Sequence, residues 1–197
     1  MKAEDFEEVS REQLLRLVDR QEAEIIKMRK KLYYKNLRQV IFSTAAAFIT
    51  LIAVVAIIFT FFMPILYIYG NSMSPTFQEG DIVLTVKTSS VSQGNAIAFY
   101  YNNEIWIKRV IARPGDWVDI DEDGNVYVNE KLLEEPYLYK KVRGDCNIDL
   151  PYQVPDNQLF VLGDARDVSL DSRNAAIGCI AEEKIIGKIL VRLWPLF

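Results

Sequence analysis

The chain has 197 residues, a formal net charge of −4 and no histidine. Its length suits one globular domain, or one domain joined to a membrane anchor. Because a Ser-His-Asp triad, a Cys-His pair and a His-bearing metal site all require an imidazole, the composition excludes all three. Residues 64–197 carry more Asp and Glu than Lys and Arg, which argues against nucleic acid as a partner.

The first long feature is an uncharged stretch between Arg38 and Glu79. Its residues 39–63 are almost entirely apolar and exceed the roughly 20 residues that a bilayer-spanning helix needs. A buried core helix is the alternative, but a domain of this size rarely encloses so long an uncharged helix. A cleaved secretory signal is disfavoured, because a long charged segment precedes the stretch. We therefore expect residues 39–63 to be a membrane anchor.

Positive charge flanks this anchor on one side only. The basic residues nearest its N-terminal end are Lys27, Arg29, Lys30, Lys31, Lys35 and Arg38, whereas residues 64–78 carry no charge. This bias predicts a single-pass protein of the cell membrane with a cytoplasmic N-terminus and residues 64–197 outside. Residues 1–38 form a basic amphipathic segment, helical over 10–37 by its apolar spacing. That helix either is solvated, continues into the anchor and holds its Lys and Arg near anionic headgroups, or pairs with itself or a partner.

Residues 64–197 show the pattern of short strands and turns. Runs rich in Val, Ile, Tyr and Thr are separated by Gly, Pro, Asn and Asp. The predicted strands are Ile82–Val86, Ala96–Tyr101, Ile105–Ile111, Trp117–Ile120, Val126–Val128, Leu159–Leu162 and Ile185–Trp194. We therefore predict a mainly β extracytoplasmic domain behind one N-terminal transmembrane helix, with the boundary near Pro64.

The segment 119–130 matches the spacing of a calcium-binding loop. The matching residues are Asp119, Asp121, Asp123, Gly124 and Glu130. An EF-hand needs flanking helices, whereas Val and Ile alternate on both sides here, so we expect a hairpin and no metal. Two cysteines, Cys146 and Cys179, follow in the outer part, where a disulfide is permitted but is not specified by their spacing.

Without histidine, a nucleophilic serine needs another base, and a lysine held neutral by burial can serve. Ser72 lies between Gly70 and a Met-Ser-Pro turn, which could present its hydroxyl on a loop. Lys108 lies in an apolar run, with Arg109 on the opposite face by strand alternation. The plainer alternatives are a Ser-Pro turn leading into a strand and a solvated lysine on an edge strand.

Four ordered blocks, over about residues 39–190, resemble type I signal peptidases, the bacterial leader peptidase family, in the small single-anchor form of Gram-positive bacteria. These blocks are Ser72-Met-Ser-Pro-Thr76, Gly80-Asp-Ile-Val83, the strand from Lys108 to Pro114-Gly-Asp116, and the loop from Gly163 to Arg173. The resemblance implies a signal-peptidase-type antiparallel β domain and a serine endopeptidase that needs no cofactor. It also implies cleavage of secreted preproteins after small-x-small sites such as Ala-x-Ala.

The resemblance implies a role for each matching residue. Ser72 would attack the scissile carbonyl, and its backbone N–H would stabilise the oxyanion. Lys108 would take the serine proton and then activate the deacylating water. Four residues would support this pair, with Ser169 holding the lysine amine: Ser169, Asp164, Asp171 and Arg173. The implied partners are signal peptides, the lipid bilayer and the secretion translocon.

The chain departs from the family pattern near the expected site. Gly70 stands where some members have a serine that donates to the oxyanion, so the second donor is not identified. Ala165 and Val168 each stand where an asparagine is usual, and Cys179 begins a segment where Phe-Val-Pro is usual. The loss of two amides could loosen the loop that supports the lysine and reduce activity.

Two other functions compete with this interpretation. A self-cleaving repressor shares the Ser/Lys pair on a related β fold, but that class is soluble and carries a helix-turn-helix. A signal-peptidase-like protein without activity could instead serve as an assembly or chaperone module for surface polymers. The intact Ser72, Lys108 and Ser169 argue against this second function.

Overall fold

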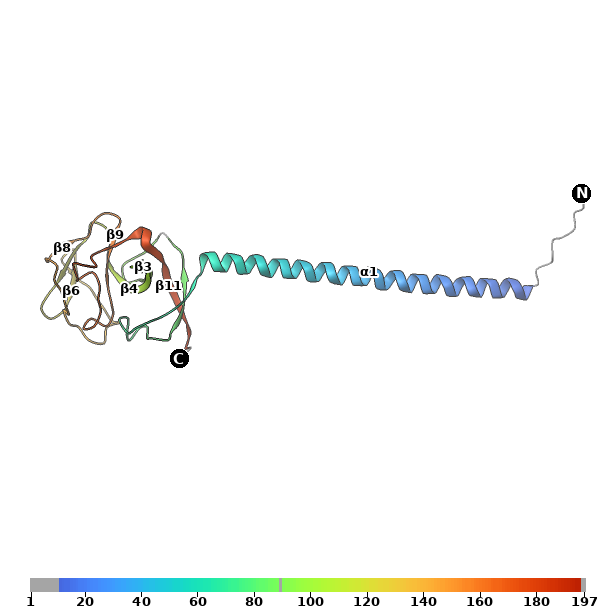
Figure 1. Cartoon of the computed structure of the whole chain (residues 1–197), viewed down its shortest axis with the longest axis horizontal. Coiled ribbons are helices and arrows are strands. Elements are labelled where there is room, and N and C mark those ends of the chain that lie inside the picture. The colour runs from blue at the N-terminus through green and yellow to red at the C-terminus, as the bar shows by residue number, and fades with distance from the viewer. Residues whose placement is uncertain (1–10, 89, 196–197) are drawn as a thin grey trace, which may run out of the picture. The chain divides into compact units, whose positions relative to one another are not determined.

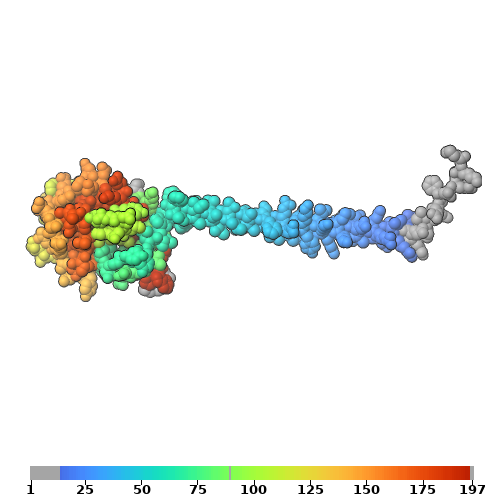
Figure 2. Space-filling view, in the orientation of Figure 1, coloured from blue at the N-terminus to red at the C-terminus, as the bar shows by residue number. Residues whose placement is uncertain are grey.

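The computed structural model describes residues 11–88 and 90–195, and the chain divides into two compact units, Met1–Ile57 and Ile58–Phe197. A single helix, α1, spans Arg11–Phe62, so the predicted amphipathic helix and the predicted anchor are one continuous helix. Position 10, where that helix was expected to begin, lies outside the described residues. Residues 14–62 are exposed throughout, and Figure 2 shows the helix as one continuous rod. The helix is long and apolar enough to cross a membrane, and its exposure disfavours a buried core helix.

The second unit is built on a seven-stranded antiparallel sheet with the order β1-β2-β11-β3-β4-β9-β10. Figure 1 labels β3, β4, β9 and β11 of this sheet. Its strands are β1 Ile65–Tyr67, β2 Ile82–Val86, β3 Ala96–Tyr101, β4 Glu104–Ala112, β9 Gln158–Leu162, β10 Ile180–Ala181 and β11 Ile185–Trp194. A 3-10 turn, Glu182–Lys184, precedes β11. The pairing of β3 with β4 is regular from Ala96↔Arg109 to Tyr101↔Glu104, so consecutive β4 side chains alternate between the two faces.

A smaller antiparallel sheet has the order β7-β6-β5-β8. Its strands are β5 Trp117–Ile120, β6 Val126–Val128, β7 Lys131–Leu132 and β8 Tyr152–Gln153. The predicted hairpin is confirmed, because β5 pairs with β6 around a turn in which Gly124 has a φ of 82°. One apolar cluster joins the two sheets: Ile111 and Phe160 of the large sheet pack with Val118 and Val126 of the small one.

All seven predicted strands are present, and the mainly β fold is confirmed. Three boundaries differ by one residue, since β4 runs from Glu104 to Ala112 and β9 begins at Gln158. Four strands were not predicted, namely β1, β7, β8 and β10, each of two or three residues and too short for a legible alternation. Both cysteines are free thiols, and burial raises the pKa of Cys179 to about 11.

Candidate active site

The loop that carries Ser72 follows β1 and is anchored from beneath by Met73. The Met73 side chain is 2% exposed and lies in a cluster with Ile68 and Val83. Burying such a side chain contributes about 1.5–3 kcal/mol. Gly70 enters the loop with a φ of 77°, a backbone conformation that would strain the serine found there in some family members. Ser72 is therefore held on a fixed turn, where it is partly exposed.

Lys108 lies on β4 and is 4% exposed. Its amine donates a hydrogen bond to Ser169 Oγ at 3.1 Å and lies 5.5 Å from the centroid of the Trp106 ring. Burial lowers the pKa of Lys108 to about 8, because desolvation disfavours the charged form, and nearby charges have smaller and opposing effects. The apolar surroundings that the sequence predicted for this lysine are present.

The loop between β9 and β10 contacts both expected catalytic residues. The Ala165 N–H donates to the Ser72 carbonyl at 3.0 Å, and the Ser169 N–H donates to the Ala165 carbonyl at 3.0 Å. Gly163 makes this close approach possible, since a Cβ there would lie 2.1 Å from Ser169 Oγ and 2.5 Å from the Ser72 carbonyl oxygen. One turn thus positions the nucleophile loop and the lysine's partner together.

Asp171 and Arg173 brace the same loop from inside. Arg173 is 1% exposed, and its Nε and Nη2 each donate to Asp171 at 2.8 Å. The Asp171 carboxylate also accepts the Gly163 N–H at 3.0 Å. Arg173 further donates to the Arg166 carbonyl at 3.0 Å and to the Ser169 carbonyl at 3.3 Å. The two residues contact the loop as the resemblance implies.

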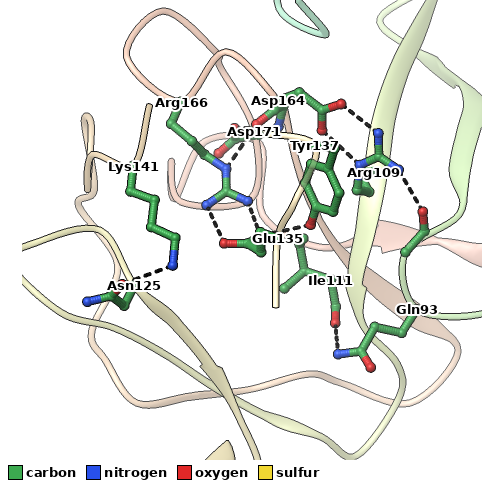
Figure 3. Close-up of polar contacts among 12 residues, drawn as sticks. Gln93, Arg109, Ile111, Asn125, Glu135, Tyr137, Lys141, Asp164, Arg166 and Asp171 are labelled. Atoms are coloured by element: carbon green, nitrogen blue, oxygen red, sulfur yellow. Dashed lines mark hydrogen bonds and ion pairs between the residues drawn. The ribbon is translucent and has the colours of Figure 1, made fainter. Parts of the chain in front are cut away.

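Asp164, which was expected to support the pair, forms a third connection, and its partners Arg109 and Thr76 were not predicted. Arg109 donates to its two carboxylate oxygens at 2.8 and 2.6 Å, and the Thr76 hydroxyl donates to Asp164 Oδ2 at 2.5 Å (Figure 3 shows Arg109 and Asp164). This joins the strand of Lys108, the segment after Ser72 and the β9–β10 loop. The available signal was an arginine next to the candidate base and an aspartate in the loop block.

Ser72 and Lys108 line one cleft of about 230 Å³. Its lining residues are Tyr67, Ile68, Tyr69, Gly70, Ser72, Met73, Ile105, Trp106, Ile107, Lys108, Val168 and Leu170. Val168, at one of the two positions of the missing amides, is 67% exposed. At the other position, Ala165 holds Ser72 through its backbone N–H. The contacts that support the lysine therefore do not require the two amides.

Comparison with known proteins identifies the family of the chain. A family described as signal peptidase, peptidase S26, matches residues 41–194. Signal peptidase IB of Staphylococcus aureus (strain Mu50 / ATCC 700699) is 39% identical over 181 residues, which cover 82% of this chain and 91% of that protein. A probable signal peptidase I-2 of Synechocystis sp. is 36% identical over 148 residues, covering 69% of this chain and 65% of that protein. A crystal structure of a signal peptidase I from Enterococcus faecalis V583 is 27% identical, covers 52% of this chain and 97% of that chain, and has a TM-score of 0.44.

The family match and the two relatives show that the chain is a serine peptidase, and therefore a hydrolase. It belongs to the signal peptidase family, peptidase S26. The activity of this family is the removal of signal peptides from secreted proteins. The long apolar helix α1 fits a membrane-bound enzyme of this kind.

Proposed function

We propose that this signal peptidase uses Ser72 as nucleophile and Lys108 as general base. The observation that carries the proposal is that both side chains line one cleft, while the lysine is buried against Ser169. With a pKa of about 8, about one tenth of the Lys108 amines are neutral at pH 7, against well under ~1% for a solvated lysine. The neutral amine is thereby abundant enough to serve as a base.

The reaction then proceeds in two stages. Ser72 Oγ attacks the scissile carbonyl carbon as Lys108 Nζ accepts its proton, and the Ser72 backbone N–H stabilises the oxyanion. The lysine returns the proton to the leaving amine, which departs and leaves an acyl ester on Ser72. Lys108 next takes a proton from water, whose oxygen attacks the ester. The lysine then returns this proton to Ser72 Oγ as the ester C–O bond breaks, which releases the new carboxyl end and restores Ser72 and the neutral amine. The hydrogen bond to Ser169 keeps the amine aligned in both stages.

The substrate side of the proposal follows from the family, whose members remove signal peptides, and the resemblance implies cleavage after small-x-small sites such as Ala-x-Ala. The cleft that Ser72 and Lys108 line would receive the residues beside the scissile bond. We further propose that residues 1–38 are cytoplasmic, residues 39–63 cross the bilayer once, and residues 64–197 act outside. Only a short segment joins Met63 to Ser72, and an extended chain spans at most about 3.6 Å per residue. The nucleophile would therefore work near the outer membrane surface, where the translocon delivers preproteins.

Cleavage of a preprotein by the full chain in detergent tests the dyad. The parent should cut after Ala-x-Ala, whereas Ser72→Ala and Lys108→Met should lose at least about 10³-fold in kcat/KM. The parental kcat/KM should rise about tenfold per pH unit below the Lys108 pKa of about 8 and level off above it. Cleavage that survives in Lys108→Met would refute the assignment of the base. Absence of cleavage by a folded parent would favour the noncatalytic assembly role.

A further inference from the structure

Glu135 lies in the irregular segment between β7 and β8, outside all four blocks that carry the family resemblance. Its carboxylate is nevertheless fully buried, with a side-chain exposure of 0%. Figure 3 shows it between Arg166 on one side and Tyr137 on the other. A buried carboxylate is costly unless its charge is matched, so the partners of Glu135 indicate what it stabilises.

The first partner, Arg166, belongs to the turn that holds the nucleophile loop. Both carboxylate oxygens of Glu135 accept hydrogen bonds from the Arg166 guanidinium, which is 2% exposed. In this orientation, Arg166 Nε donates to the Gly163 carbonyl at 3.0 Å and closes the turn on itself. The Ala165 N–H that holds the Ser72 carbonyl lies inside this same turn.

The second partner, Tyr137, connects Glu135 to the strand of the lysine. Its hydroxyl donates to Glu135 Oε1 at 2.8 Å, and its ring lies 3.9 Å from the guanidinium carbon of Arg109. Burial and the Glu135 carboxylate raise the pKa of Tyr137, so the hydroxyl stays protonated and donates. Arg109 directly follows Lys108 on β4, and a cation held over an aromatic face is stabilised there.

We infer that Glu135 is a positioning residue for cleavage, which fixes the Ala165 turn through Arg166 and fixes Arg109 of β4 through Tyr137. The inference rests on the proposed Ser72/Lys108 dyad. Neither Glu135 nor its two partners line the cleft, so their effect reaches the reaction through geometry rather than through substrate contact. The charged groups that face the Glu135 carboxylate are Arg166 and, beyond the Tyr137 ring, Arg109.

A loosened turn would change Lys108 in a measurable way. Ser169 reaches the amine from the same loop, and Asp171, Arg173 and Asp164 are the charged groups around it. Because burial is the main cause of the low pKa of Lys108, water entering beneath a displaced loop would raise that pKa. The acid limb of the pH–rate profile would then move to higher pH.

The test compares kcat, KM and the pH profile of kcat/KM for the full chain and its variants in detergent, below their unfolding temperatures. Glu135→Gln should lower kcat at least about tenfold, change KM less than threefold and move the acid midpoint up by at least about 0.5 pH units. Arg166→Lys keeps the charge but loses the Nε donor, and it should shift the profile in the same direction. The matched control is Glu134→Gln, which changes the exposed neighbouring carboxylate and should behave like the parent.

The outcomes separate this inference from the proposed function. If the parent fails to cleave, or Lys108→Met cleaves, the dyad itself is wrong. If the parent cleaves and folded Glu135→Gln keeps the parental kcat and midpoint, Glu135 is not a positioning residue. A loss of activity in proportion to the unfolded fraction, with an unchanged midpoint, would mean a purely structural role and overturn the inference. If Glu135→Gln does not fold, Arg166→Lys decides by the same criteria.

Discussion

Lys108 and Arg109 are adjacent on β4 and both buried, yet their surroundings differ in electrostatic character. Arg109 is matched by a carboxylate that accepts two hydrogen bonds and by an aromatic ring at 3.9 Å. Lys108 has the Ser169 hydroxyl and the face of the Trp106 ring beside it, and none of the ion pairs between described residues involves it. The strand therefore presents one compensated cation and one uncompensated cation to the same loop.

The difference separates rigidity from reactivity. A paired guanidinium keeps its charge and orientation, which suits a residue that joins three segments. An amine that is buried without a carboxylate loses its proton more readily, which suits a base. The two requirements cannot be met by one side chain, and β4 meets them with two neighbouring residues.

The largest expected effect comes from removing the carboxylate that pairs with Arg109. Asp164→Ala should leave the Arg109 guanidinium buried without its counter-charge, which costs about 3–5 kcal/mol of unfolding free energy. Thermal unfolding of the full chain in detergent, followed by near-UV circular dichroism, measures this loss.

The control for that variant is an ion pair at the surface. Arg143 pairs with Glu122, whose side chain is 89% exposed, so Glu122→Gln should leave the unfolding temperature unchanged within error. Equal losses in Asp164→Ala and Glu122→Gln would show that burial does not distinguish the two pairs.

A smaller effect on the unfolding free energy, of opposite sign, is expected when Lys108 is replaced. The pKa of Lys108 is about 8 in the folded state and about 10.5 when unfolded, so below pH 8 the folded state must hold a buried charge. By linkage this penalty is on the order of 3 kcal/mol, is complete below pH 8 and disappears as pH rises to about 10.5. Lys108→Met should therefore be more stable than the parent at pH 7.

The pH dependence of that gain checks its origin. The difference in unfolding temperature between Lys108→Met and the parent should shrink between pH 8 and about 10.5, because other titrating groups are common to both proteins. A difference that stays constant over this window would mean that packing of the methionine, rather than removal of a buried charge, stabilises the variant.

The sequence predicts the secondary structure and the candidate catalytic residues better than it predicts the residues that support them. Long apolar and alternating patterns predict α1 and the larger strands, because each repeats one local period over many residues. Ser72, Lys108 and Ser169 follow from the ordered blocks. Glu135 has no such signal, since its role depends on reaching Arg166, which is 31 positions away and which only the folded chain brings close.

Gly163 illustrates the same limit at shorter range. Its sequence block identifies Gly163 as part of a loop. That no side chain fits at this position becomes clear only from the fold, which brings Ser72 and Ser169 against it. The continuity of α1, by contrast, was one of the two predicted alternatives, since the change from charged to apolar composition at Arg38 alters the solvent that the helix suits but not its backbone. Composition indicates environment, whereas tertiary contacts decide the geometry.

The smallest expected effect concerns Val168, where the family pattern has asparagine. The side chain is 67% exposed, and the loop is already held by Asp171, Arg173 and the backbone of Ala165. Val168→Asn should therefore change unfolding free energy by less than about 0.5 kcal/mol and kcat/KM by less than about threefold. A large gain in cleavage would mean that the missing amide does weaken the loop. The loop at the cleft rim would then support the lysine base incompletely in this chain.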